Sequence, residues 1–139
     1  MCTIFVIGLL SGCKKEVSYN FIQDQSEIDT IEIIEVGEPD LQGVNEQISI
    51  CTIEDTTSFM GKFNQMKCYD HYGDPIGVLP DTIAIKILYS NGEYELITPI
   101  GQARYTKKRQ YKNYVGYRSF DNEEFNGLVS QYIDQNSEY

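Results

Sequence analysis

The stretch that decides the fold runs from residue 83 to residue 98 and reads IAIKILYSNGEYELIT. Apolar and polar residues alternate on both sides of Asn91-Gly92, which is typical of two antiparallel strands joined by a tight turn. A two-residue turn at Asn91 and Gly92 requires a positive φ at both positions, which these two residue types tolerate best. The stretch therefore predicts a β-hairpin.

The turn also predicts which side chains face the core. A two-residue turn sets Tyr89 opposite Tyr94, and the residues that then share the core face are Ile85, Ile87, Tyr89, Tyr94, Leu96 and Thr98. The other face carries Lys86, Leu88 and Glu95 and is mixed in character. An antiparallel sheet with one solvated face has this composition.

Two further strands are predicted upstream of the hairpin, over residues 30–36 and 47–53. The first alternates but changes phase at Ile33-Ile34, which indicates a β-bulge. The second ends shortly before Asp55, a residue type that caps helices. The helix predicted after Asp55 has its apolar residues at helical spacing: Phe59, Met60, Phe63 and Met66.

The C-terminal part predicts one more strand, over residues 111–120, and a second helix. Asp121 followed three positions later by Glu124 resembles a capping box. The core face of this helix is expected to carry Phe125, Leu128, Val129, Tyr132 and Ile133. The order of elements predicts an α+β fold: one antiparallel sheet of about five to seven strands with two helices packed on one face, forming a single domain over residues 19–139.

The N-terminus carries an uncharged apolar block over residues 4–10, far shorter than the about 20 residues that span a bilayer. Directly behind it stands Leu10-Ser11-Gly12-Cys13. This pattern of aliphatic residue, small residue, glycine and cysteine resembles the lipobox of bacterial lipoproteins, in particular small lipoproteins of the Gram-positive type. A departure is that Met1, Cys2 and Thr3 include no Lys or Arg, which an upstream start codon would explain.

The resemblance implies a specific cellular location and a lipid modification. Residues 1–12 would be a signal peptide removed between Gly12 and Cys13, the Cys13 thiol would carry a diacylglyceryl group, and residues 13–18 would be a lipidated tether. Two acyl chains on one residue give stable membrane anchoring. We therefore expect a membrane-anchored protein on the extracytoplasmic face. The alternative is that residues 1–12 are a buried strand or the first core helix of a cytoplasmic protein.

Charge is distributed unevenly along the chain. The net charge is −10, and the range 16–55 holds eleven acidic residues and no basic one, which makes nucleic acid a poor partner. A basic cluster interleaved with tyrosines comes later, with Arg104, Lys107, Lys108, Arg109, Lys112 and Arg118. Two alternatives remain open: these residues pair with the acidic N-terminal strands, or they form an exposed surface for an anionic polymer or an envelope protein.

The remaining chemistry is sparse. If Cys13 is lipidated and Cys2 removed, Cys51 and Cys68 are left either as a disulfide or as two buried free thiols. The only histidine, His71, lies in the segment from Cys68 to Asp74, which offers no ligand spacing typical of a metal site. We expect a non-enzymatic, lipid-anchored binding module without a cofactor. The alternative is an envelope enzyme or metal-binding protein that uses the Cys68 to Asp74 loop.

Overall fold

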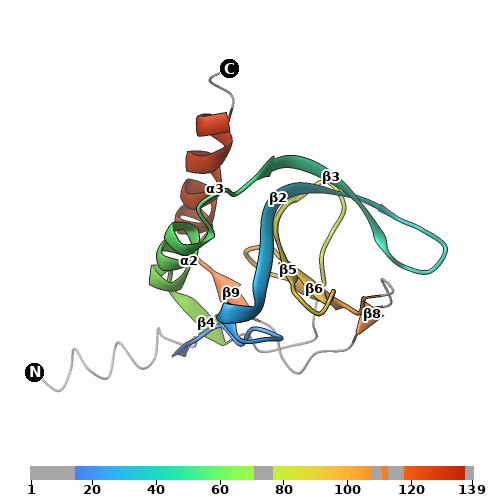
Figure 1. Cartoon of the computed structure of the whole chain (residues 1–139), viewed down its shortest axis with the longest axis horizontal. Helices are drawn as coiled ribbons and strands as arrows, with labels where there is room; N and C mark the ends of the chain where they lie inside the picture. Colours follow the sequence, from blue (N-terminus) through green and yellow to red (C-terminus); the bar gives the residue numbers. More distant parts are fainter. Residues whose placement is uncertain (1–14, 71–76, 108–110, 113–117, 137–139) are drawn as a thin grey trace, which may run out of the picture.

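The computed structural model describes residues 15–70, 77–107, 111–112 and 118–136 (Figure 1). Within these ranges it has two antiparallel sheets and two α-helices, which confirms the α+β fold. The larger sheet has six strands in the order β3-β2-β5-β6-β7-β8, and the smaller has three in the order β1-β4-β9.

The strands of the larger sheet are β2 (Ile28–Pro39), β3 (Asn45–Thr52), β5 (Ile83–Tyr89), β6 (Tyr94–Ile97), β7 (Gln102–Tyr105) and β8 (Tyr111–Lys112). The strands of the smaller sheet are β1 (Glu16–Val17), β4 (Cys68–Asp70) and β9 (Arg118–Phe120). The helices are the short 3₁₀ helix η1 (Gln25–Glu27) and the α-helices α2 (Thr56–Gln65) and α3 (Asn122–Asn136).

Both α-helices begin at the aspartates that the sequence indicates. The Asp55 side chain accepts a hydrogen bond from Ser58 N at 3.0 Å, and Asp121 Oδ1 accepts one from Glu124 N at 3.0 Å. Each bond satisfies an amide of the first turn that has no partner within the helix. The Glu124 carboxylate accepts from Lys67 N at 3.3 Å, which ties α3 to the start of β4.

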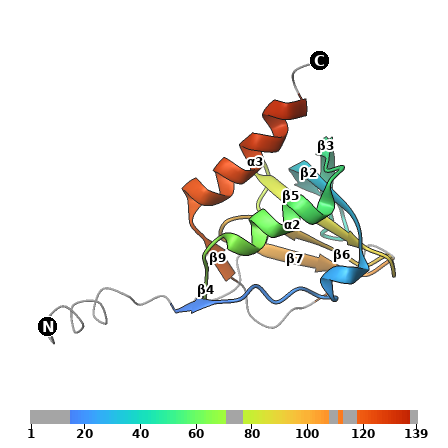
Figure 2. The ribbon, with the colours of Figure 1, turned by 60° about the vertical axis from the view of Figure 1, so that its left-hand side comes forward.

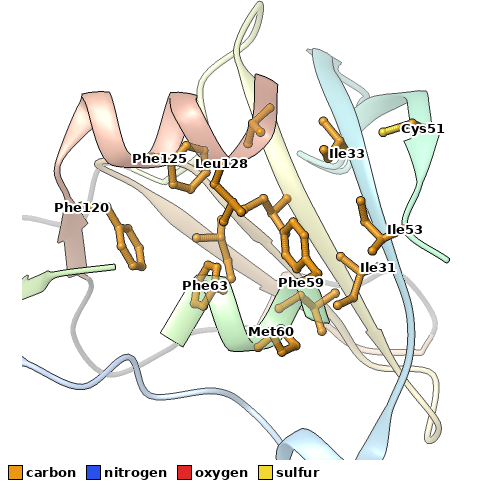
Figure 3. Close-up of a cluster of buried hydrophobic side chains, with 14 of the residues drawn as sticks. Ile31, Ile33, Cys51, Ile53, Phe59, Met60, Phe63, Phe120, Phe125 and Leu128 are labelled. Carbon is orange, nitrogen blue, oxygen red and sulfur yellow. The ribbon is translucent and has the colours of Figure 1, made fainter. Parts of the chain in front are cut away.

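The two α-helices pack on the same face of the six-stranded sheet (Figure 2), as the sequence predicts. Between them and the sheet lies the main hydrophobic core, to which α2 contributes Phe59, Met60 and Phe63 and α3 contributes Phe125, Leu128 and Val129 (Figure 3). The sheet side of this core is formed by Ile31, Ile33, Ile85, Ile87, Tyr89 and Ile97.

A second apolar cluster covers the other face of the same sheet. It contains Ile34 and Val36 from β2, whereas Ile31 and Ile33 belong to the helix-side core. The strand is thus buried on both faces, which is why Ile33 and Ile34 are both apolar. A bulge is also present: Ile33 pairs with Cys51 but Ile34 pairs with Ser49, so the extra residue is in β3.

The β5–β6 hairpin exists, but its predicted register was wrong by one residue. Leu88, not Tyr89, lies opposite Tyr94, and Ile87 lies opposite Glu95. The connection is a wider turn closed by a hydrogen bond from Gly92 N to Tyr89 O at 2.9 Å, with a positive φ of 88° at Gly92 and none at Asn91. Because a one-residue shift exchanges the faces of a strand, Glu95 points into the helix-side core and Tyr94 away from it.

Two predicted boundaries also differ from the structure. The strand expected over residues 111–120 is divided between the two sheets, as β8 and β9, with residues 113–117 outside the described part. The expected tether, residues 13–18, contains strand β1, which pairs with β4.

Candidate functional site

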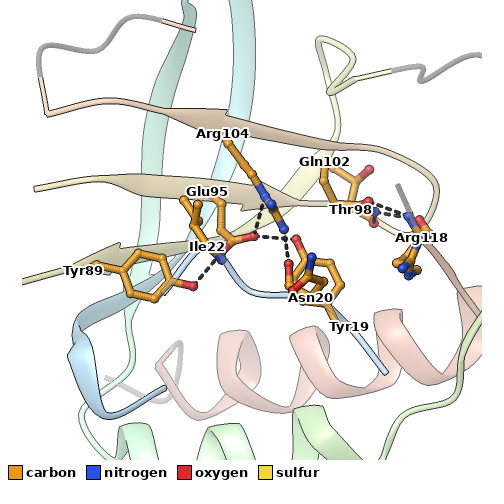
Figure 4. A network of polar contacts seen from close by, with 9 residues as sticks. All are labelled: Tyr19, Asn20, Ile22, Tyr89, Glu95, Thr98, Gln102, Arg104 and Arg118. Atoms are coloured by element: carbon orange, nitrogen blue, oxygen red, sulfur yellow. Dashed lines mark hydrogen bonds and ion pairs between the residues drawn. The ribbon is translucent and has the colours of Figure 1, made fainter. Parts of the chain in front are cut away.

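The Glu95 carboxylate is buried, and it lies at the centre of a network of polar contacts between residues 19–22 and the sheet (Figure 4). Its oxygens accept hydrogen bonds from Tyr19 Oη and Tyr89 Oη, both at 2.5 Å, and from Ile22 N at 3.1 Å. Arg104 Nε lies 3.5 Å from Glu95 Oε1, and the Arg104 side chain is 11% exposed. A buried charge is tolerated when it is paired and hydrogen-bonded in this way.

The same arrangement changes the pKa of the Tyr19 and Tyr89 hydroxyls. Burial, and after it the negative charge of Glu95, raises the pKa of Tyr19 and of Tyr89 well above the ordinary tyrosine value. Both phenols therefore remain protonated hydrogen-bond donors to Glu95 at neutral pH. The network holds the segment at residues 19–22 against the sheet.

A groove with a volume of about 550 Å³ crosses the face of the sheet that the α-helices leave open. Its lining comes from β2, β3, β5 and β6 and from residues that follow β5 and β7: Glu32, Ile34, Glu46, Gln47, Ser49, Lys86, Leu88, Gly92, Tyr94 and Lys107. Lys86 Nζ lies 4.9 Å from the centre of the Tyr94 ring, and Gln47 donates to Tyr94 Oη at 3.2 Å. Four charged residues line the groove. The two lysines are on β5 and just after β7, and the two glutamates are on β2 and β3.

The predicted basic cluster is not one continuous surface. Arg104 pairs with Glu95, and Arg118 Nη1 lies 3.2 Å from Asp70 Oδ1. Lys107 is exposed and lines the groove. Lys108 and Arg109 lie outside the described residues, and of Lys112 only the backbone, in β8, is described.

The acidic partners also differ from those expected. Arg104 and Arg118 pair with carboxylates on β6 and β4 rather than with the acidic N-terminal strands. Glu32 on β2 does lie directly opposite a basic residue, but this residue is Lys86 on β5, which is not a member of the predicted cluster. Sequence reasoning missed Glu95 altogether, since its burial depends on the register of the hairpin.

No protein-family model, curated protein or solved structure matches the chain. Functional reasoning therefore rests on the residues themselves. Among the helices of the described ranges, none has the length and apolar character that crossing a membrane requires.

The Cys68 to Asp74 loop is only partly described. Cys68 is buried in the main core, and Asp70 is bound to Arg118, whereas His71 and Asp74 fall outside the described residues. Across the part of the chain that the structure describes, no three His, Cys, Asp or Glu side chains are grouped as a metal ion needs.

Cys51 and Cys68 are free, buried thiols on strands of different sheets. Burial raises the pKa of Cys51, and burial raises that of Cys68 to about 11. A thiolate is the reactive species, so a raised pKa slows every thiol reaction at neutral pH.

We expect these thiols to be present but protected. In a chain with Cys2→Ser and Cys13→Ser, labelling by a thiol reagent at pH 8 should be about 100-fold slower in the folded protein than in urea. Two thiols per chain should be counted after unfolding without reductant. A count of zero would instead establish the disulfide.

Proposed function

We propose that this protein is a non-enzymatic binding module, anchored by lipid on Cys13 at the extracytoplasmic face of the membrane, that binds an anionic partner of the cell envelope in the groove of the open sheet face. The observation that carries the binding proposal is this groove, with Lys86, Lys107 and the Tyr94 ring on its lining. The lipobox sequence of residues 10–13 supports the anchor.

The groove suits an extended partner rather than a small metabolite. It crosses strands β3, β2, β5 and β6 and ends beside Lys107, where the basic sequence of residues 107–109 begins. Leu88 is half-buried and provides an apolar contact, whereas Ile34 and Tyr94, only 1% and 5% exposed, form the floor of the groove. The Tyr94 ring stacks on Tyr105 with centroids 4.7 Å apart, which holds this floor in place. A pre-formed site binds a partner at a lower entropic cost.

The charges give the groove a direction. Anionic groups of a polymer or an acidic protein are attracted to Lys107 beyond β7 and repelled by Glu46 on β3, while Glu32, directly opposite Lys86, offsets part of the charge of that lysine. Binding through exposed lysines is screened by salt. The proposed interaction should therefore weaken as ionic strength rises.

Charge substitution in the groove should remove binding. The test variant combines Lys86→Gln with Lys107→Glu, because Gln avoids placing a carboxylate opposite Glu32. Co-sedimentation or titration with poly(glycerol phosphate) and with polyglutamate should give at least a tenfold lower affinity at low salt. Lys67→Glu, an exposed lysine before β4 and outside the groove lining, is the control and should bind as the unmodified protein does. Equal binding by the groove variant would contradict the proposal.

The anchor has a separate test. Mass spectrometry of the protein made in a bacterial host should find an N-terminal Cys13 that carries diacylglycerol, and detergent partitioning should place the protein in the detergent phase. The variant Cys13→Ser should move to the aqueous phase. An intact, unmodified Met1 would contradict the anchor.

A further inference from the structure

The chain is attached to the folded domain almost immediately after Cys13. Lys15 O accepts a hydrogen bond from Asp70 N at 2.8 Å. Glu16 and Val17 then form β1, in register with Tyr69 and Cys68 of β4. The backbone is therefore hydrogen-bonded to β4 from the second residue after the predicted lipidation site and is part of a sheet from the third.

Contacts beyond β1 fasten the same segment to the core. Tyr19 Oη and Ile22 N donate to the buried Glu95, and Arg104 donates to Asn20 O. The Tyr19 ring packs edge-on against Phe63 of α2, with centroids 5.9 Å apart. Releasing residues 15–22 would expose apolar rings and leave a buried ion pair without two of its hydrogen-bond donors.

From these contacts, and resting on the proposed Cys13 anchor, we infer that the domain has no flexible tether and sits directly on the bilayer through the end of the β1–β4–β9 sheet that holds Lys15, Asp70 and Arg118. Only Lys14 separates Cys13 from Lys15, so the two Cα atoms are at most about 7 Å apart. The headgroup layer of one leaflet is about as thick. Lys15 is therefore held at the level of the headgroups.

The chemistry of this end suits anionic phospholipid headgroups. Lys15 is exposed, and across the sheet from it stand Asp70 on β4 and then Arg118 on β9, which form an ion pair with each other. Basic residues close to the membrane surface are attracted by anionic lipids. The connection between β2 and β3 lies on the opposite side of the molecule from β1 and would point away from the bilayer (Figure 1).

Tryptophan quenching tests this orientation, because the chain contains no tryptophan of its own. Tyr69→Trp places a reporter on β4, far from Cys13 in sequence, and Leu41→Trp places one on the exposed β2–β3 connection. In the full lipidated chain in phosphatidylglycerol vesicles with headgroup spin labels, we expect at least threefold stronger quenching at position 69. A Gly/Ser linker of about ten residues between Lys14 and Lys15, which spans about 17 Å, should remove that difference.

The amide of Asp70 gives a second measurement that needs no substitution near the sheet. Its hydrogen exchange should be slow in the lipidated protein, since Lys15 O is its acceptor. Fast exchange, or equal quenching at positions 69 and 41 with Cys13 shown by mass spectrometry to carry lipid, would overturn the orientation and leave the anchor standing. An unmodified Cys13 would overturn the anchor and the orientation together.

Discussion

Replacing Glu95 by glutamine is expected to lower the free energy of unfolding by about 3–5 kcal/mol. The substitution removes the negative charge opposite Arg104, whose side chain is only 11% exposed and so has little access to water. It also replaces a carboxylate that accepts three hydrogen bonds by an amide with one acceptor oxygen, so its NH2 group faces either the Tyr19 hydroxyl or the Tyr89 hydroxyl and Ile22 N. Urea denaturation followed by circular dichroism measures the loss.

Two companion variants distinguish the buried charge from any glutamate in the sheet. Glu35→Gln, an exposed glutamate on β2, should change the stability by no more than about 0.5 kcal/mol. The double variant Glu95→Leu/Arg104→Met leaves no charge unpaired. Its loss of unfolding free energy should therefore be smaller than the sum of the losses in the single variants Glu95→Leu and Arg104→Met. Additive losses would show that the pair is not coupled.

Replacing Phe59 by alanine is the second change with a large expected effect, a loss of about 3–5 kcal/mol. Phe59 is fully buried between α2 and the sheet and contacts the Tyr132 ring of α3 edge-on, with centroids 5.2 Å apart. Its removal leaves a cavity at the junction of both helices and the sheet (Figure 3). The same denaturation experiment measures the loss.

Gly61 provides the matched control on the same helix. An added Cβ at this position meets nothing within 4 Å, so Gly61→Ala changes only the helix propensity of α2. We expect it to raise the stability by up to about 1 kcal/mol. If Phe59→Ala cost less than about 1 kcal/mol, α2 would not be an integral part of the core.

Patterns that are local in the chain were predicted well. Asp55 and Asp121 cap the helices as expected, and the apolar residues at helical spacing after them do face the core. These features depend on residues within one or two turns of each other. The same holds for the existence of the β5–β6 hairpin.

Features that depend on the register or on distant partners were not predicted. The stretch Ser90-Asn91-Gly92 allows both a two-residue and a wider turn, and the choice between them decides whether Glu95 is exposed or buried. Burial of Glu95 in turn explains why Arg104 lies inside the domain as its ion-pair partner. In the sequence, Arg104 is recognisable only as one member of a basic cluster. The partner of Arg118, Asp70, is 48 residues away.

Strand β1 is another element that could not be predicted from the sequence. Glu16-Val17 is too short and too polar at one end to be recognised as a strand, and it exists because β4 offers a free edge. The placement of β4 depends in turn on β9, beyond residue 117. A short strand assembled from three distant segments leaves no periodic signal.

The β3 side of the six-stranded sheet has a consequence for the protein at high concentration. Within the described ranges β3 pairs only with β2, and it exposes Ile48 and Ile50, which are 48% and 37% accessible. An exposed apolar strand edge is a template for aggregation into larger sheets. Here the bulge at Ile50 breaks the regular spacing of the edge, and Glu46 adds a charge beside it. These two features oppose the pairing of two copies of the chain through their exposed β3 edges.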